Sequence, residues 1–235
     1  MAARDEHLLA EEIVAACRRA LPPLAGAILH GSLASGDFVP GKSDVDVLAI
    51  VDERPSEREL AALTSALDGL RRHAAAAADL CVVTRRTAAA PSPNPPVEIY
   101  IRLDPAEESL EVETRRSRPD LVVEFSVCRA HGRSLTGEGA RELIGEVPDE
   151  WVMSVGDEVL ATWQRQDYDP AMAVFVVLTA CRIWRFSEER VHCSKQQAGL
   201  WALQRDPSLA VVRATLRDLP VAESDVRALM SLAGR

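Results

Sequence analysis

Residues 30–50 read HGSLASGDFVPGKSDVDVLAI. The pair Gly31 and Ser32 follows a short apolar run and opens a turn or a short helix. The chain then enters the apolar run VDVLAIV, which has the character of a strand. Asp44 and Asp46 are two residues apart, so in an extended chain their side chains point to the same side. One face of this strand therefore carries two neighbouring carboxylates.

Two carboxylates side by side repel each other, and a divalent cation between them removes the repulsion. Mg²⁺ is usually bound by one or two carboxylates together with substrate phosphates. Gly31 and Ser32 suit the phosphates, because free backbone N–H groups and a hydroxyl at the start of a turn or helix hold a phosphate oxygen. Ser43 offers a second hydroxyl. The alternative interpretation is an edge strand with solvent-facing acids after a glycine turn.

The first half of the chain alternates helices with short strands. Apolar residues at helical spacing predict a helix over 6–20, and the capping box S-E-R-E opens a second helix over 56–77. Short apolar runs predict four strands, at residues 27–30, 45–51, 80–83 and 97–101. A further helix is expected over 118–135, ending at Gly132 with a left-handed C-cap.

Strand signals disappear after Pro148. The remaining sequence predicts helices, at residues 149–166, 170–187 and 194–205 and in two shorter segments that reach Leu232. A boundary near residue 145 therefore separates a mixed α and β half from an all-helical half. We expect an α+β protein with two domains, residues 1–145 and 146–235.

The composition limits the partners. The chain has 235 residues and a net charge of −9, and an acidic surface repels nucleic acid and anionic membranes but accommodates a cationic small molecule. The five cysteines are scattered without a C-x-x-C pair, which favours reduced thiols over disulfides or a zinc site. No apolar run reaches the roughly 18 residues of a membrane span. We expect a cytoplasmic monomer with neither a nucleic acid nor a membrane as partner.

The pattern H-G-S followed by S-D-V-D-V-L resembles the signature of the DNA polymerase β-like nucleotidyltransferase superfamily. Three further segments resemble the linker and helical C-terminal domain of the aminoglycoside 3″/9-adenylyltransferases, the streptomycin and spectinomycin resistance enzymes. These segments are DLVVEFSVCRAHGRSLTGE (120–138), VVLTACRIWRF (176–186) and SKQQAGLWALQRDP (194–207). The resemblance implies an N-terminal nucleotidyltransferase domain with a short mixed sheet, a helical C-terminal domain, ATP as the donor and Mg²⁺ as the cofactor.

The resemblance also implies roles for individual acids. Asp44 and Asp46 correspond to the residues that bind the catalytic metal. Asp79 falls where the family has the carboxylate that deprotonates the acceptor hydroxyl, a glutamate in the enzymes known best, so its side chain is one methylene shorter. Glu98, in the next predicted strand, is the other acid that could serve as the base or contact the substrate.

Arg182 and Lys195 fall where the family contacts the nucleotide phosphates from the helical domain. Arg182 also interrupts an almost wholly apolar helix, where a guanidinium needs an anionic partner, and a salt bridge to a glutamate would satisfy it equally well. Lys195 follows Ser194, which with Gln197 forms a capping box, so the lysine is expected at a positive helix terminus.

The match weakens where the family chooses its acceptor. Tyr168 and Met172 occupy two positions that are acidic in the streptomycin enzymes, leaving Asp167 and Asp169 nearby, and residues 102–113 lack the tryptophan that stacks on streptomycin. We therefore expect poor modification of streptomycin and a preference for spectinomycin or another hydroxylated, cationic amine. The alternatives are the same chemistry on a biosynthetic intermediate or a protein hydroxyl, and a non-catalytic regulatory protein that binds nucleotide.

Overall fold

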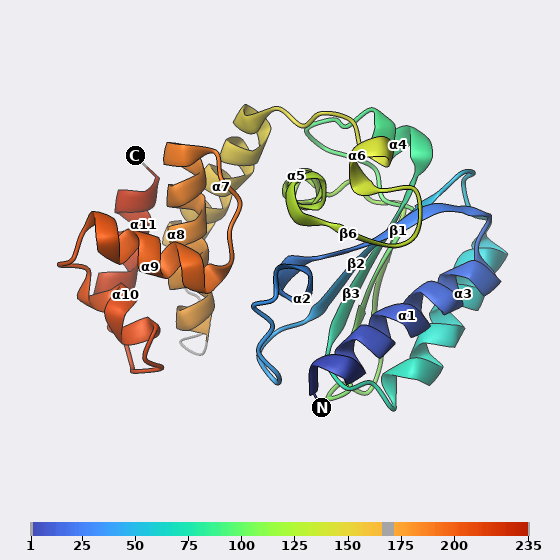
Figure 1. Cartoon of the computed structure of the whole chain (residues 1–235), viewed down its shortest axis with the longest axis horizontal. Coiled ribbons are helices and arrows are strands. Elements are labelled where there is room, and N and C mark those ends of the chain that lie inside the picture. Colours follow the sequence, from blue (N-terminus) through green and yellow to red (C-terminus); the bar gives the residue numbers. More distant parts are fainter. Residues whose placement is uncertain (1, 166–171, 235) are drawn as a thin grey trace. The chain divides into compact units, whose positions relative to one another are not determined.

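The computed structural model describes residues 2–165 and 172–234, and it divides into two compact units, residues 1–147 and 148–235 (Figure 1). The first unit contains a sheet covered by helices, and every described element of the second unit is a helix. This arrangement confirms the predicted α+β fold. In the described part of the chain, no helix is long and apolar enough to cross a membrane.

The first unit is built on a six-stranded sheet in the order β5-β4-β3-β2-β1-β6. Its strands are β1 (Leu24–His30), β2 (Val45–Val51), β3 (Ala78–Thr84), β4 (Ile99–Leu103), β5 (Glu111–Thr114) and β6 (Arg133–Gly137). β2 and β3 are parallel, and the other neighbouring pairs are antiparallel. The sheet is therefore mixed, as expected.

Helices cover both faces of the sheet. They are α1 (Ala2–Ala20), α2 (Gly31–Ser35), α3 (Glu57–Arg71), α4 (Arg85–Ala89), α5 (Leu121–His131) and α6 (Ala140–Leu143). Figure 1 shows α1 and α3 on one face and α4, α5 and α6 on the other. The capping box that opens α3 is present, because the Ser56 hydroxyl accepts the Glu59 N–H and the Glu59 carboxylate accepts the Ser56 N–H.

β2 shows how a buried strand can carry an acid. Val45 and Val47 point into the core beneath α1 and α3, whereas Leu48 and Ile50 point into the core beneath α5. Asp46 has the parity of Leu48 and Ile50, so it faces the α5 side, at the end of the strand where a pocket replaces the apolar core. Asp46 therefore lies where the apolar core beneath α5 ends.

The predicted helix over 118–135 is wrong at its C-terminal end. α5 stops earlier, and the following residues form β6, an edge strand paired with β1. Gly132 is extended, with φ −62° and ψ 142°, and is not a left-handed cap. A Cβ there would lie 2.5 Å from the Cys128 carbonyl oxygen and 2.6 Å from Cγ2 of Ile28, so glycine permits the close passage of α5 over the sheet.

The second unit consists of α7 (Asp149–Arg165), α8 (Ala173–Glu189), α9 (Lys195–Arg205), α10 (Ala210–Thr215) and α11 (Glu223–Ala233). Its apolar core includes Val177, Trp184 and Met230. The predicted capping box at the start of α9 is present, because the Ser194 hydroxyl accepts the Gln197 N–H and the Gln197 side chain accepts the Ser194 N–H. The helical prediction for this half is confirmed.

Candidate active site

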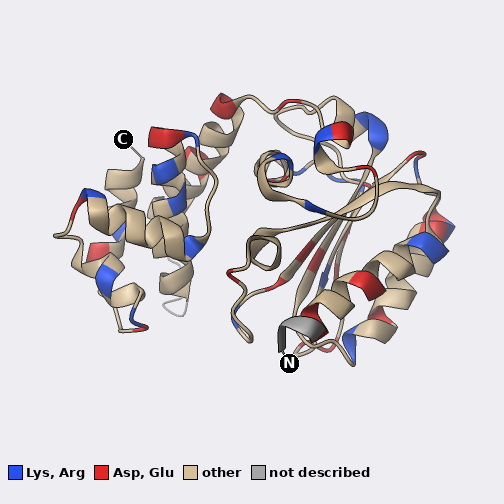
Figure 2. Ribbon diagram, viewed as in Figure 1, with Lys and Arg blue, Asp and Glu red and all other residues tan. Residues whose placement is uncertain are grey.

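A row of polar side chains crosses the sheet on the α5 face. His30 of β1 is opposite Asp46 of β2, Asp46 is in register with Asp79 of β3, and Asp79 is opposite Arg102 of β4. Side chains that are in register on neighbouring strands lie on the same face of a sheet. Asp44, two residues before Asp46, also points to this face. The register therefore brings Asp79 to the face that carries Asp44 and Asp46, more than thirty residues earlier in the sequence, and Figure 2 shows acidic segments on the central strands.

Gly31 allows the second aspartate to lie against the turn that follows β1. Its φ is +65°, a conformation that favours glycine, and a Cβ at this position would lie only 1.8 Å from Oδ2 of Asp46. Any side chain would displace the carboxylate. The Gly-Ser pair and Asp46 are therefore one structural unit, which places backbone N–H groups of α2 beside a carboxylate.

Asp79 is held by two donors from β4. The Tyr100 hydroxyl donates a hydrogen bond of 2.7 Å to Oδ1, and Nη1 of Arg102 lies 3.2 and 3.1 Å from the two Asp79 oxygens. The same Nη1 lies 3.1 Å from Oδ2 of Asp44. Burial raises the pKa of Asp79, and the Tyr100 hydrogen bond and the Arg102 charge partly offset this. A fixed carboxylate with a raised pKa is suited to accept a proton.

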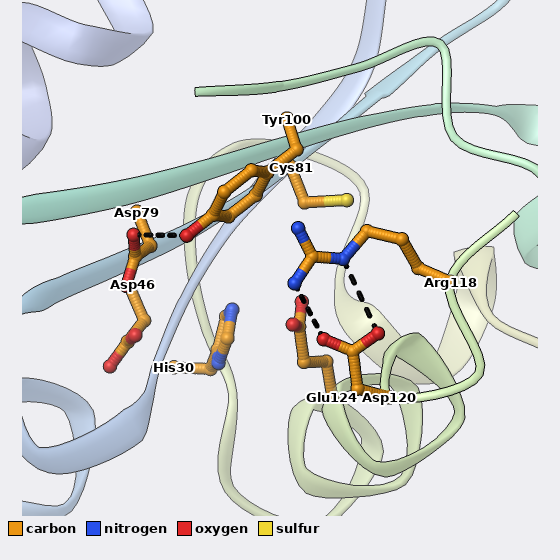
Figure 3. Close-up of a pocket in the computed structure, with 8 residues that line it drawn as sticks. All are labelled: His30, Asp46, Asp79, Cys81, Tyr100, Arg118, Asp120 and Glu124. Carbon is orange, nitrogen blue, oxygen red and sulfur yellow. Dashed lines mark hydrogen bonds and ion pairs between the residues drawn. The ribbon is translucent and has the colours of Figure 1, made fainter. Parts of the chain in front are cut away.

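Asp46 and Asp79 line a pocket of about 200 Å³ between the sheet and α5 (Figure 3). It is lined by His30, Asp46, Asp79, Cys81, Tyr100, Arg118, Asp120 and Glu124. The Arg118 guanidinium pairs with Asp120 at 2.6 Å and lies 3.9 Å from the centroid of the Tyr100 ring. Burial lowers the pKa of His30 to about 4, so this imidazole is neutral at pH 7.

A second, more open hollow adjoins the pocket and shares Tyr100, Arg118 and Asp120 with it. Its other lining residues are Glu111, Glu113, Arg116, Ser117 and Pro119. Tyr100 therefore lies between this hollow and Asp79, to which its hydroxyl is hydrogen-bonded. A molecule in the hollow would lie beside the residue that holds Asp79.

The carboxylates of Asp44 and Asp46 suit a magnesium ion whose other ligands are supplied by substrate phosphates. Within the described residues, no three His, Cys, Asp or Glu side chains are grouped so as to hold a metal. Asp44 and Asp46 nevertheless present two hard oxygen ligands on one face, and Asp46 lies against the turn at Gly31. Two carboxylates plus phosphate oxygens are a usual Mg²⁺ ligand set. The protein supplies part of such a site.

Glu124 of α5 is a half-buried carboxyl group in the pocket. Burial, together with the nearby carboxylates of Asp120 and Asp46, raises the pKa of Glu124 to about 8. At pH 7 this group is therefore mostly protonated and can donate a hydrogen bond. Neutrality limits the negative charge that collects around Asp46.

We expect the substitution Glu124→Gln to stabilise the metal-free protein at pH 8 and to change little at pH 5. The wild-type carboxyl ionises near pH 4.5 when unfolded but only near pH 8 when folded, so the free energy of unfolding falls as pH rises from 4.5 to 8. Glutamine removes this loss, a gain on the order of 2 kcal/mol after allowance for partial exposure.

Amide hydrogen exchange in β2 measures this effect, since all four tryptophans lie in the second unit and would report on that unit instead. The exposed Glu11→Gln variant is the control for the loss of one charge. Equal stabilisation of Glu124→Gln at both pH values would contradict a raised pKa at Glu124.

Two other predicted site residues are already engaged. Glu98 is buried and forms ion pairs with Arg54 at 3.1 Å and with Arg115 at 3.5 Å, and it does not line either of the two hollows described above. This placement favours Asp79 over Glu98 as the base. The Ser43 hydroxyl accepts a hydrogen bond of 3.1 Å from the Val39 N–H, within the loop that leads into β2.

The remaining predicted residues belong to the second unit. Arg182 is half-buried in α8, and Lys195 is the first residue of α9, with its ammonium group 4.1 Å from the centroid of the Phe175 ring. Met172 is exposed and precedes α8 directly. Tyr168, Asp167 and Asp169 lie outside the described residues.

Comparison with protein-family models decides the family. Residues 10–135 match the model described as nucleotidyltransferase domain, which covers more than half of the chain, and residues 142–217 match the model described as aminoglycoside adenylyltransferase, C-terminal domain. The chain belongs to the aminoglycoside adenylyltransferase family of nucleotidyltransferases. It is therefore an enzyme of the nucleotidyltransferase class, and the non-catalytic alternative is set aside.

Comparisons with individual proteins agree with the family models. Aminoglycoside (3″)(9) adenylyltransferases from Klebsiella pneumoniae and Escherichia coli are 28% identical to this chain over 217 residues, covering 84% of this chain and 78% of theirs. A spectinomycin adenyltransferase from Enterococcus faecialis, solved with ATP and spectinomycin, has the same fold, with a TM-score of 0.71 and 14% identity over 98% of this chain and 97% of that one.

In this adenylyltransferase-family chain, the residues that surround the predicted acids were not predicted from the sequence: Tyr100, Arg102, Arg118, Asp120 and Glu124. One signal was present. In VEIYIRL the apolar residues Ile99, Ile101 and Leu103 alternate with Tyr100 and Arg102, which indicates that the two polar residues share the opposite face of the strand. The sequence could not show that this face meets Asp79, because that depends on the β3 and β4 register.

Proposed function

We propose that this nucleotidyltransferase transfers AMP from ATP to a hydroxyl group of an aminoglycoside or an aminocyclitol-like small molecule, in a Mg²⁺-dependent reaction. The observation that carries the proposal is the group of three carboxylates on one face of the sheet, with Asp46 fitted against Gly31 and with Asp79 fixed by Tyr100 and Arg102. The names of the relatives support the donor and the acceptor class.

Asp44 and Asp46 would hold the magnesium ion, and Gly31, Ser32 and Ser43 would bind the phosphates beside it. When bound, Mg²⁺ screens the charge of the triphosphate and orients the phosphate that is attacked. Gly31 has no side chain that could keep a phosphate oxygen away from its backbone N–H. The serine hydroxyls donate hydrogen bonds to the same oxygens.

Asp79 acts as the general base. Its carboxylate accepts the proton of the acceptor hydroxyl while the acceptor oxygen forms a bond to the α-phosphorus, and the bond from that phosphorus to the oxygen of the β-phosphate breaks, releasing pyrophosphate. Tyr100 and Arg102 fix the orientation of the carboxylate. The Asp79 side chain is one methylene shorter than that of glutamate. Its fixed orientation, together with a pKa raised by burial, nevertheless supports its assignment as the base.

Arg182 and Lys195 are proposed to bind the nucleotide phosphates. We expect Arg182→Ala and Lys195→Ala each to weaken ATP binding by about tenfold or more, because a charge-assisted hydrogen bond contributes about 1.5–3 kcal/mol. Calorimetric titration with ATP and Mg²⁺ measures this, with Arg217→Ala, an exposed arginine of the second unit, as the matched control. Unchanged affinity in both folded variants would remove these residues from the site.

The acceptor is proposed to be cationic and closer to spectinomycin than to streptomycin. Tyr168 and Met172 replace two acids of the streptomycin enzymes, and each missing charge-assisted contact lowers affinity by about ten- to a hundredfold. Asp167 and Asp169 remain to attract an amine. The kcat/KM for spectinomycin should therefore exceed that for streptomycin by at least about tenfold, as measured by pyrophosphate release. An equal or reversed ratio would contradict this assignment.

A further inference from the structure

Arg102 is a cation that the chain itself places among the three acids. Its Nη1 lies 3.1 Å from Oδ2 of Asp44 and 3.1 Å from Oδ2 of Asp79, and its Nη2 lies 3.7 Å from Asp104. The Arg102 side chain is 31% exposed, and those of Asp44 and Asp79 are 38% and 24% exposed. The guanidinium is therefore partly buried. It lies between Asp44, which is assigned to the metal, and Asp79, which is assigned as the base.

The strand that carries Arg102 fixes this position. Ile101 and Leu103, on either side of it, are buried in the core beneath α1 and α3, so the arginine must point to the α5 face. Its Cα is directly opposite that of Asp79. Nη1 consequently lies between Asp44 and Asp79, at 3.1 Å from each, and within the described residues no three ligands are grouped for a metal.

We propose that Arg102 divides the three carboxylates into a metal-binding pair and a separate base. Its positive charge pairs with the ionised Asp79 carboxylate, which keeps Asp79 out of the metal's ligand set. Arg102 also competes with the metal for Asp44. The free ion therefore binds weakly until nucleotide phosphates complete its ligands. Arg102 is thus a positioning residue for Asp44 and Asp79. This inference rests on the proposed function, because it assumes that Asp44 and Asp46 are the metal ligands.

The test is a titration of the nucleotide-free protein with Mn²⁺, in which electron paramagnetic resonance measures the free ion. We expect Arg102→Gln to bind Mn²⁺ about tenfold more tightly than the wild type, because it removes a charge-assisted competitor for Asp44. The matched control is Arg85→Gln. Arg85 also joins two carboxylates, but these are Asp52 at 2.8 Å and Glu138 at 2.6 Å, and neither is assigned to the metal or to the base, so its loss should leave Mn²⁺ affinity unchanged.

Two further variants separate the role of Arg102 from the assignment of the metal ligands. Arg102→Lys retains the charge but presents a single compact ammonium group, so its Mn²⁺ affinity should lie between those of the wild type and Arg102→Gln. Asp46→Asn should abolish the saturable Mn²⁺ site. Equal or weaker binding by both folded Arg102 variants, or equal tightening by Arg85→Gln, would overturn the role of Arg102 while leaving the proposed function intact. Saturable binding that survives Asp46→Asn would instead count against the metal assignment itself.

Discussion

Replacing Asp46 with asparagine is expected to lower kcat by about a thousandfold or more while the first unit stays folded. The substitution removes one of two carboxylates assigned to Mg²⁺, and the metal supplies several kcal/mol of charge stabilisation in phosphoryl chemistry. Asparagine has nearly the same shape as aspartate. Its side chain can therefore still fill the space next to Gly31 that is open because Gly31 has no Cβ. Initial rates with ATP, Mg²⁺ and spectinomycin measure the loss.

The matched control for this variant is Asp52→Asn, an exposed acid just beyond the other end of β2 that pairs with Arg85. It removes the same charge from the neighbourhood of the same strand but should retain near-normal activity. Circular dichroism verifies that both variants are folded. A folded Asp46→Asn protein with wild-type turnover would show that Asp46 does not bind the metal.

Asp79→Asn is expected to lower kcat by about a hundred- to ten-thousandfold, the usual contribution of a general base. ATP affinity should change little, because Asp79 is assigned to the acceptor and not to the phosphates. Asp79→Glu keeps a carboxylate and restores the side chain typical of the family, so it should retain far more activity than the asparagine variant. Comparing kcat and KM for the two variants separates loss of the base from loss of binding.

The pH profile gives a second readout for Asp79. A base must be ionised, so the rate should rise with pH through the pKa of Asp79, and burial, which raises this pKa, moves the limb to higher pH. The limb should be absent in Asp79→Asn. If Glu98→Gln removed activity and the pH limb while Asp79→Asn kept both, the base would be Glu98, despite its ion pairs with Arg54 and Arg115.

Asp44 and Asp46 could be predicted as site residues because both lie at the start of one apolar run, in SDVDVLAIV. Carboxylates are rarely buried without a partner, so two of them at alternate positions there indicate a site once the Gly-Ser pair is considered with them. The Gly-Ser turn could be predicted for the same reason, since Gly31 directly follows an apolar run. Local residue chemistry was sufficient in both cases.

The partners of these acids depend on pairing between distant strands. Arg102 reaches Asp79 because the two are opposite each other in the antiparallel register of β3 and β4, and a shift of one residue would turn Arg102 toward the other face. β5 and β6 were missed because they lack apolar runs: β5 reads EVET and β6 reads RSLTG. Both are edge strands, whose polar residues face water.

The most direct test of the central claim is mass spectrometry of the acceptor after incubation with ATP, Mg²⁺ and spectinomycin, with released pyrophosphate and ADP quantified in the same sample. We expect the acceptor to gain the mass of one AMP, one pyrophosphate to appear for each adduct, and Asp46→Asn to form neither product. A phosphorylated acceptor with ADP as the second product, or no nucleotide adduct on any hydroxylated amine tested, would contradict it.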